Sequence, residues 1–202
     1  SSVTVNEPPP IGGTFTVIDA ICNGNCDGSI TGNLTGGTGA PNSWSLLWNT
    51  GDTALTISGL CAGMYSVLMV DSVGCSASDS VLVSEPVAMV VAISSKDASC
   101  NGSADGTLST AVTGGTTPFT YSWTGGLPAN PTHTGVSPGS YTVDVTDSIG
   151  CVVSDSVVLT EPTVLVLSAV VGGALCFGDS SGMIGLTVSG GTSPYQFSWS
   201  TG

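Results

Sequence analysis

The sequence predicts an all-β protein made of tandem two-sheet sandwiches. Residues 119–123 and 141–145 alternate apolar and polar side chains, as half-buried strands do, and helical periodicity is absent. Glycine occupies 29 of the 202 positions, which favours short strands joined by tight turns. Several landmarks also recur at a fixed spacing, which indicates that one small domain is repeated along the chain.

The repeat is set by a Glu-Pro dipeptide at Glu7, Glu85 and Glu161, which gives periods of 78 and 76 residues. A cysteine follows each of these glutamates by 15 residues, and a Gly-Gly pair and a tryptophan come after it. We therefore expect the C-terminal strand of a preceding repeat at 1–8, full repeats at 9–86 and 87–162, and the N-terminal part of a further repeat at 163–202. This pattern predicts a segment of a longer array.

Within the first full repeat, strands are expected at 15–20, 29–35, 43–48, 54–57, 64–70 and 77–83. Glycine-containing turns separate them. Six or seven short strands in fewer than ~80 residues are typical of an immunoglobulin-like β-sandwich. Trp48, Trp123 and Trp199 recur at equivalent positions, and we expect them to anchor the sandwich cores.

Charge and composition exclude several functions. The chain has 14 acidic residues against one basic residue, Lys96, and its net charge of −13 makes nucleic acid and anionic membranes poor partners. With no arginine and a single histidine, His133, acid/base and nucleophile–histidine catalysis lack the residues they need, so we expect no enzyme. The longest apolar runs, 87–93 and 164–171, have the length of strands, so no membrane insertion is expected in this segment.

Seven cysteines leave one unpaired within the chain. Repeat equivalence predicts two long-loop bridges, Cys22–Cys75 and Cys100–Cys151, with the partner of Cys176 lying beyond residue 202. Cys26 and Cys61 occur in the first full repeat alone and are expected to pair with each other. Such bridges place the protein outside the cytoplasm. A zinc site formed by Cys22, Cys26, Cys61 and Cys75 is the alternative, although its ligand spacing is loose.

Two further residue classes have weaker functional interpretations. Acidic residues recur at turns and junctions, and calcium could bind Asp71, Asp147, Glu85 and Glu161, although turn formation and solubility also explain them. No other cofactor is expected. His133 is expected in a solvated loop, and Lys96 beside Asp97 is expected to be an incidental surface pair rather than an isopeptide cross-link.

The second repeat resembles a known family through an ordered set of motifs. They include Cys-Asn-Gly at 100–102, Gly-Gly-Thr at 114–116, Pro-Phe-Thr-Tyr-Ser-Trp at 118–123, Pro-Gly-Ser-Tyr-Thr-Val at 138–143 and the closing Glu-Pro at 161–162. This succession resembles the SprB repeat of long surface adhesins of gliding Bacteroidota, which the type IX system typically exports. The resemblance implies surface display, adhesion and gliding, and it brings no catalytic motif. Departures include Leu47 before Trp48, Cys61 in place of the usual proline and Ser181 in place of aspartate.

Five Asp-Ser/Thr-apolar triplets resemble the O-glycosylation signal of secreted Bacteroidota proteins, and ordinary turn chemistry is the alternative explanation at each. The candidate hydroxyls are those of Thr53, Ser72, Ser80, Ser148 and Ser156.

We therefore expect a structural segment of an extracellular adhesin stalk or filament at the cell surface. Its expected partners are adjacent repeats, with other copies in a filament, surface glycans or abiotic surfaces as further candidates. The alternatives are a carbohydrate- or surface-binding module and an accessory array of a secreted hydrolase.

Overall fold

The computed structural model describes residues 3–39 and 44–200, and its regular structure is β throughout. The chain forms two compact units. Unit 1 comprises residues 1–89 with the short segments 114–117 and 148–151, and unit 2 comprises 90–113, 118–147 and 152–202. In the described ranges, no helix has the length and apolar character that crossing a bilayer requires.

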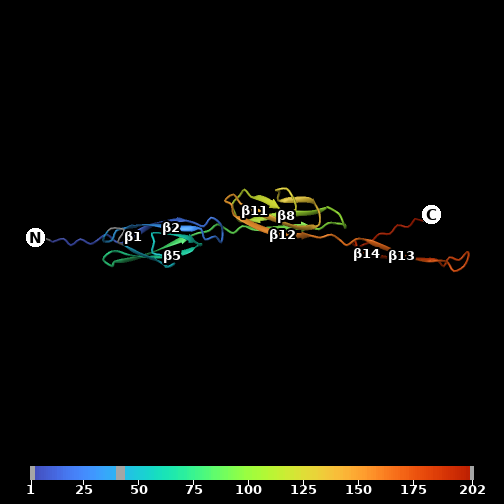
Figure 1. Ribbon diagram of the computed structural model, residues 1–202, viewed down its shortest axis with the longest axis horizontal. Coiled ribbons are helices and arrows are strands. Elements are labelled where there is room, and N and C mark those ends of the chain that lie inside the picture. The colour runs from blue at the N-terminus through green and yellow to red at the C-terminus, as the bar shows by residue number, and fades with distance from the viewer. Residues whose placement is uncertain (1–2, 40–43, 201–202) are drawn as a thin grey trace. The chain divides into compact units, whose positions relative to one another are not determined.

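Unit 1 contains a sandwich of two three-stranded antiparallel sheets (Figure 1). The first sheet has the order β1-β2-β4 and the second β3-β5-β6. The strand bounds are β1 Gly12–Ile18, β2 Gly28–Thr35, β3 Ser45–Trp48, β4 Thr56–Leu60, β5 Gly63–Val70 and β6 Ser76–Val83. This distribution matches strands A, B and E against C, F and G of an immunoglobulin sandwich, as the sequence predicts.

The core of this sandwich consists of side chains that alternate along the strands. Ile30 and Val83 are fully buried, and Trp48 retains 1% of its surface. Trp48 packs edge-on against Phe15 with ring centroids 5.6 Å apart, and its indole Nε1 donates to the Ala54 carbonyl at 3.0 Å. The Tyr65 hydroxyl donates to the Cys61 carbonyl at 2.9 Å, which is the tyrosine-corner arrangement of immunoglobulin-like domains.

The strand directions define two ends of the repeat. The exit end carries residues 19–27, 61–62 and 84–86, because β1, β4 and β6 end there and β2 and β5 begin there. The entry end carries residues 8–11, 36–38 and 71–75, where β2 and β5 end. Since β4 is antiparallel to β2 and β3 is antiparallel to β5, β3 and β4 run in the same direction. Residues 49–55 return the chain between them.

Unit 2 repeats this architecture with sheets β7-β8-β10 and β9-β11-β12. Leu108, Val143 and Leu159 form part of its core. The Trp123 indole donates to the Asn130 carbonyl at 2.9 Å and the Tyr141 hydroxyl to the Ser137 carbonyl at 2.8 Å, so both anchors recur. The strand bounds are β7 Val90–Lys96, β8 Gly106–Thr113, β9 Thr120–Trp123, β10 Thr132–Val136, β11 Gly139–Thr146 and β12 Val152–Leu159.

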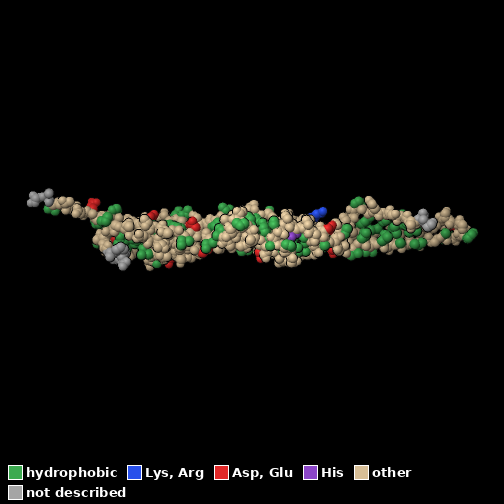
Figure 2. Space-filling view, turned by 90° about the horizontal axis from the view of Figure 1, so that it is seen from above, with side chains coloured by type: hydrophobic (Ala, Val, Ile, Leu, Met, Phe, Trp, Pro, Cys, Tyr) green, Lys and Arg blue, Asp and Glu red, His purple; other side chains and the backbone are tan. Residues whose placement is uncertain are grey.

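The stretch after residue 163 forms a single hairpin, β13 (Val166–Gly172) with β14 (Met183–Ser189). Apolar side chains gather on its surface, as the C-terminal part of Figure 2 shows. Trp199 is 59% exposed, so the expectation that it anchors a core is wrong. The described part of this stretch holds two strands, which cannot enclose an indole as the facing sheets around Trp48 do.

The predicted strands of the first repeat correspond to observed strands with shifts at their ends. The strand expected at 15–20 lies at Gly12–Ile18, and the one expected at 54–57 lies at Thr56–Leu60. Ser43, where the third expected strand starts, lies outside the described residues. Alternating side chains therefore identified each strand of the first repeat but not its exact ends.

Candidate functional site

A carboxylate clamp at the exit end explains the recurring Glu-Pro motif. The backbone N–H of Gly24 donates to Glu85 Oε2 at 2.7 Å, and Asn23 Nδ2 donates to the Pro86 carbonyl at 3.1 Å. In the second repeat, the Gly102 N–H donates to Glu161 Oε2 at 2.6 Å. The last residues of each repeat thus close the loop between its first two strands.

Asparagine completes the same clamp in the second repeat. Asn101 Nδ2 donates to Glu161 Oε1 and to the Pro162 carbonyl, both at 3.1 Å. The sequence analysis did not single out Asn23 or Asn101 as site residues, although both follow the equivalent cysteines in a repeated Asn-Gly pair. That repetition was the signal that could have identified them.

Two aspartates per repeat cap backbone donors at the exit end. The Ser84 N–H donates to Asp19 Oδ1 at 2.8 Å, and the Thr160 N–H donates to the equivalent Asp97 at 2.8 Å. The Thr160 backbone and hydroxyl bonds lower the pKa of Asp97. Lys96 beside it is exposed, and the Asp97 oxygens accept from Thr160, which is consistent with an incidental neighbour.

The loop between the first two strands has a second aspartate cap. The Ile21 N–H donates to Asp27 Oδ1 at 3.0 Å, and the Ser99 N–H donates to the equivalent Asp105 at 2.9 Å. Hydrogen bonds from the Ser99 side chain and backbone lower the pKa of Asp105. The Asp-Gly pairs that the sequence marked as turns are therefore caps on this loop.

Asp71 organises the entry end of the first repeat. Its carboxylate is buried and accepts from the backbone N–H groups of Thr38, Val73 and Cys75 at 2.9–3.0 Å. Burial alone would raise its pKa, but backbone bonds from Thr38, Cys75, Val73 and Gly74 together lower it. Asp147 is buried at the equivalent position of the second repeat.

The Gly-Gly pairs let the chain pass closely at the entry end. Gly36 has φ of 75°, and a Cβ there would lie 1.9 Å from the Pro10 carbonyl oxygen. The equivalent Gly114 would place a Cβ 2.1 Å from the Ala88 oxygen. Only glycine fits, because both the space and the left-handed backbone exclude a side chain.

The four calcium candidates have backbone partners or lie buried. Three of them, Asp71, Glu85 and Glu161, accept the hydrogen bonds described above, and Asp147 is 6% exposed. Across residues 3–39 and 44–200, no group of three or more His, Cys, Asp or Glu side chains could hold a metal ion. Calcium binding remains a prediction, and thermal unfolding with and without a chelator tests it.

The disulfides correct the predicted pairing. Cys22 bonds to Cys151, within unit 1, and not to Cys75. The expected bonds Cys22–Cys75 and Cys100–Cys151 are therefore wrong, and the thiols of Cys75 and Cys100 are free and exposed.

The second predicted bridge, Cys26–Cys61, is confirmed. Since Cys22, Cys26 and Cys61 form disulfides, the four-cysteine zinc alternative loses three of its ligands. Cys176 is free and exposed.

The position of the loops explains why the long-loop pairs cannot form. Cys22 lies between β1 and β2 at the exit end, whereas Cys75 lies between β5 and β6 at the entry end. β5 spans the distance between these ends with eight residues, or roughly 25 Å, whereas a disulfide needs Cα atoms about 4.4–6.8 Å apart. The same strand geometry separates Cys100 from Cys151.

His133 lies in a strand core, contrary to the expected solvated loop. It belongs to β10, is 8% exposed and packs edge-on against Trp123 at 5.2 Å between ring centroids. Its Nε2 is buried without a hydrogen-bond partner. The equivalent residue in β4 of the first repeat is Ile57, so an imidazole has replaced an aliphatic core side chain.

The five candidate glycosylation sites are exposed. Ser80 and Ser156 lie on the outward faces of β6 and β12, and Thr53 lies in the loop between β3 and β4. The Ser72 hydroxyl donates to the Thr38 carbonyl at 2.8 Å and that of Ser148 to the Thr116 carbonyl at 3.2 Å. All five positions are accessible, and two hydroxyls also have a local partner.

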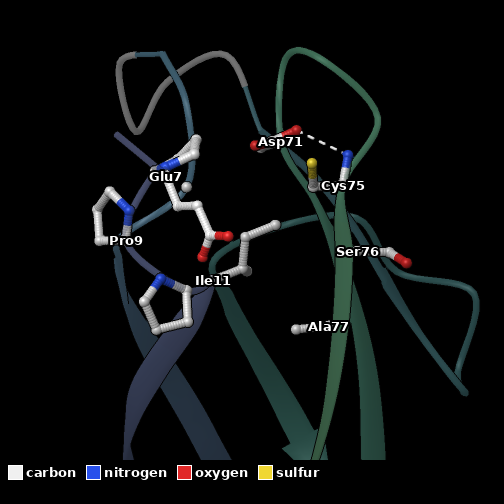
Figure 3. Close-up of a pocket in the computed structure, with 10 residues that line it drawn as sticks. Glu7, Pro9, Ile11, Asp71, Cys75, Ser76 and Ala77 are labelled. Carbon is white, nitrogen blue, oxygen red and sulfur yellow. Dashed lines mark hydrogen bonds between the residues drawn. The ribbon is translucent and has the colours of Figure 1, made fainter. Parts of the chain in front are cut away.

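A pocket of about 480 Å³ opens at the entry end of the first repeat (Figure 3). Glu7 and Pro9 of the incoming chain form one wall, and Asp71 and Cys75 lie across from them. A second pocket, of about 420 Å³, lies in unit 2 and contains Cys100. Both pockets therefore combine a free thiol with residues of a Glu-Pro junction.

Comparison with known proteins identifies a repeat family in two places. The model of the SprB repeat matches residues 92–128 and 171–202. No curated protein matches this chain.

Two solved structures share a low overall similarity with the chain. The three N-terminal domains of the highly immunogenic outer capsid protein Hoc of bacteriophage RB49 are 16% identical, with a TM-score of 0.41, and the match covers 90% of this chain and 69% of that one. A tetra-tandem repeat from the extending region of a large adhesion protein is 17% identical, with a TM-score of 0.24, and the match covers 89% and 63% of the two chains.

Proposed function

We propose that this chain is a structural segment of an extracellular adhesin stalk or filament, because the model of the SprB repeat matches residues 92–128 and 171–202. In this proposal the segment is displayed on a bacterial surface, where it serves adhesion and gliding. It is a non-enzymatic module whose partners are the neighbouring repeats. Two disulfides support its placement in an oxidising, extracellular environment.

The observation that carries the proposal is the clamp at the end of each complete repeat. Glu85 and Glu161 bind the Gly24 and Gly102 N–H groups with nearly the same geometry. The aspartate caps are likewise repeated, so charged side chains hold loops in place instead of converging on a reacting centre. Such a module suits a load-bearing array, in which each domain must keep its own ends closed.

Immunogold electron microscopy on intact cells that make the protein tests this function. Antibodies against the folded 202-residue chain should label unpermeabilised cells outside the envelope, and their Fab fragments should reduce attachment to surfaces. Fab fragments against another abundant surface protein serve as the control. Labelling that requires permeabilised cells, or attachment unaffected by Fab, contradicts the proposal.

The carbohydrate-binding alternative lacks an aromatic platform in the complete repeats. Trp48, Trp123 and Tyr141 are buried there, and Phe15 packs against the core. The exposed aromatic side chains belong to the stretch after residue 163, where Phe177 and Trp199 are among them. A structural role therefore accounts better for both complete sandwiches.

We further propose that O-linked glycans occupy some of the five exposed Asp-Ser/Thr-apolar sites. Ser80 and Ser156 are the best placed, because their neighbours Val81 and Val157 turn inward and leave the hydroxyls on the solvent face. Intact-mass spectrometry of the protein from the cells that make it should give a mass above that of the bare polypeptide. The double variant Ser80→Ala and Ser156→Ala should carry less mass above that of its own polypeptide. A mass of the unsubstituted protein equal to that of the bare polypeptide contradicts the proposal.

A further inference from the structure

The free thiols of the complete repeats occupy the same positions as the bonded cysteines. Cys100 is the equivalent of Cys22, and both lie at the exit end of their repeats. Cys75 is the equivalent of Cys151, and both lie at the entry end. We name Cys22, Cys100 and Cys176 the exit cysteines, and Cys75 and Cys151 the entry cysteines.

The one bond between these classes joins an exit cysteine to the entry cysteine of the next repeat. Cys22 belongs to the first repeat and Cys151 to the second, at a sequence separation of 129. This bond lies at a Glu-Pro junction, because Gly24, two residues after Cys22, binds Glu85. Cys151 Sγ also approaches the Ile21 carbonyl at 3.6 Å.

Each free thiol of the two complete repeats lies beside a Glu-Pro junction as well. Cys75 shares the entry pocket with Glu7 and Pro8, the junction that precedes its own repeat (Figure 3). Cys100 shares the unit 2 pocket with Pro162 and with Gly191, a glycine equivalent to those at the entry end of the complete repeats. Cys75 and Cys100 therefore lie at Glu-Pro junctions, as the existing bond does.

We propose that Cys75 and Cys100 are half-sites of the same repeat-to-repeat disulfide. Cys75 takes the exit cysteine of a preceding repeat, and Cys100 takes the entry cysteine of a following repeat. The array is then covalently linked at every junction in addition to its peptide chain. This inference needs a neighbouring repeat but does not depend on adhesion, so it stands or falls separately from the proposed function.

The chemistry is a two-electron oxidation. Two thiols lose two protons and two electrons as the S–S bond forms, and a disulfide oxidant, such as an oxidised dithiol exchange catalyst of the extracytoplasmic space, is reduced to its dithiol. The exposure of Cys75 and Cys100 leaves both thiols accessible to such a catalyst.

Disulfide mapping of the protein from the cells that make it decides the proposal. Free thiols are blocked with N-ethylmaleimide, and the unreduced protein is digested with pepsin, because Lys96 is the one basic residue for trypsin. Cys75 should be linked to an exit cysteine, and Cys100 to an entry cysteine, of another repeat or another copy. The proposal is overturned if Cys75 or Cys100 is recovered with its thiol blocked by N-ethylmaleimide. It is also overturned if peptides linked by Cys22–Cys75 or Cys100–Cys151 are recovered.

Variants of the 202-residue chain, kept in a glutathione redox buffer, test whether exit cysteines pair with entry cysteines. Cys75 is the free entry cysteine, so Cys75→Ser should abolish covalent dimers on a non-reducing gel. Cys100→Ser is the matched control, because it keeps Cys75 and Cys176 and should still form dimers. Equal dimer yields from both variants, or a monomeric unsubstituted chain, contradict pairing between exit and entry cysteines.

Discussion

A histidine occupies a core position of the second repeat that isoleucine fills in the first. His133 and Ile57 are both buried, but His133 has an imidazole nitrogen without a partner. The local sequence around His133 obscured this, because the neighbouring prolines favour a loop and the strand β10 is short. Aligning the repeats position by position would have placed His133 opposite Ile57.

His133→Ile should therefore stabilise the second repeat. Removing an unsatisfied buried polar group should raise the free energy of unfolding by about 1–3 kcal/mol, as measured by urea denaturation. Ile57→His is the matched control and should destabilise the first repeat by a similar amount. A destabilised His133→Ile variant would mean that the imidazole has a partner in solution.

Asp71 should make the entry end sensitive to acid. Its pKa is lowered in the folded state, so its contribution to stability is complete above the ordinary carboxyl pKa and is lost as the pH falls through the lower, folded-state value. Thermal unfolding between pH 7 and about pH 2 should show this decline. Asp71→Asn should flatten that part of the profile, and an unchanged profile would contradict the role of the charge.

At the scale of the strands, the alternation of apolar and polar side chains predicted where the strands lie, but the loops between them determined their directions. Each expected strand of the first repeat was found, because alternating burial is encoded locally. The direction of the strands is not local: residues 49–55 carry the chain back, so β3 and β4 run the same way. Repeat equivalence predicted bonds within each repeat, whereas these strand directions place Cys22 and Cys75 at opposite ends, so that pairing was wrong.

The Cys26–Cys61 bridge ties two exit-end loops of the first repeat. It spans 35 residues, and the chain-entropy model assigns such a loop about 3–4 kcal/mol. Replacing both cysteines with serine should lower the free energy of unfolding by that amount in denaturant titrations.

The second repeat offers a matched test of the same bridge. Ala104 and Ser137 occupy the equivalent positions, and the loops approach each other similarly there: a Cβ on Gly59 would lie 4.0 Å from the Cys26 oxygen, and one on Gly135 would lie 3.7 Å from the Ala104 oxygen. Ala104→Cys with Ser137→Cys should form a bridge and raise stability. No change on oxidation would contradict the equivalence of the loops.

At the scale of the whole chain, the Cys22–Cys151 bond should limit extension under force. A chain pulled from its ends in force spectroscopy cannot lengthen through the 129 residues that the bond closes off. Reduction should add about 450 Å of contour length, at ~3.5 Å per residue. Extension that is independent of the reductant would contradict the bond.

Cys22→Ser is the control for that measurement. Without reductant it retains Cys26–Cys61, which withholds 35 residues, or about 120 Å. The variant should therefore gain about 330 Å over the oxidised chain. On reduction of the unsubstituted chain, a gain that matches two separate loops of roughly 50 residues would instead indicate bonds within each repeat.

The clamp that closes each repeat also sets an order of events while the chain is synthesised. The hydrogen bond of the Gly24 N–H cannot form until Glu85, 61 residues later, has been added to the chain. That of the Gly102 N–H likewise requires Glu161, 59 residues later. A chain that emerges from its N-terminus therefore completes each domain only when the final residues of that domain have appeared. Domains mature one after another in the direction of emergence, and the Cys22–Cys151 bond can form only once the second domain has emerged almost to its end.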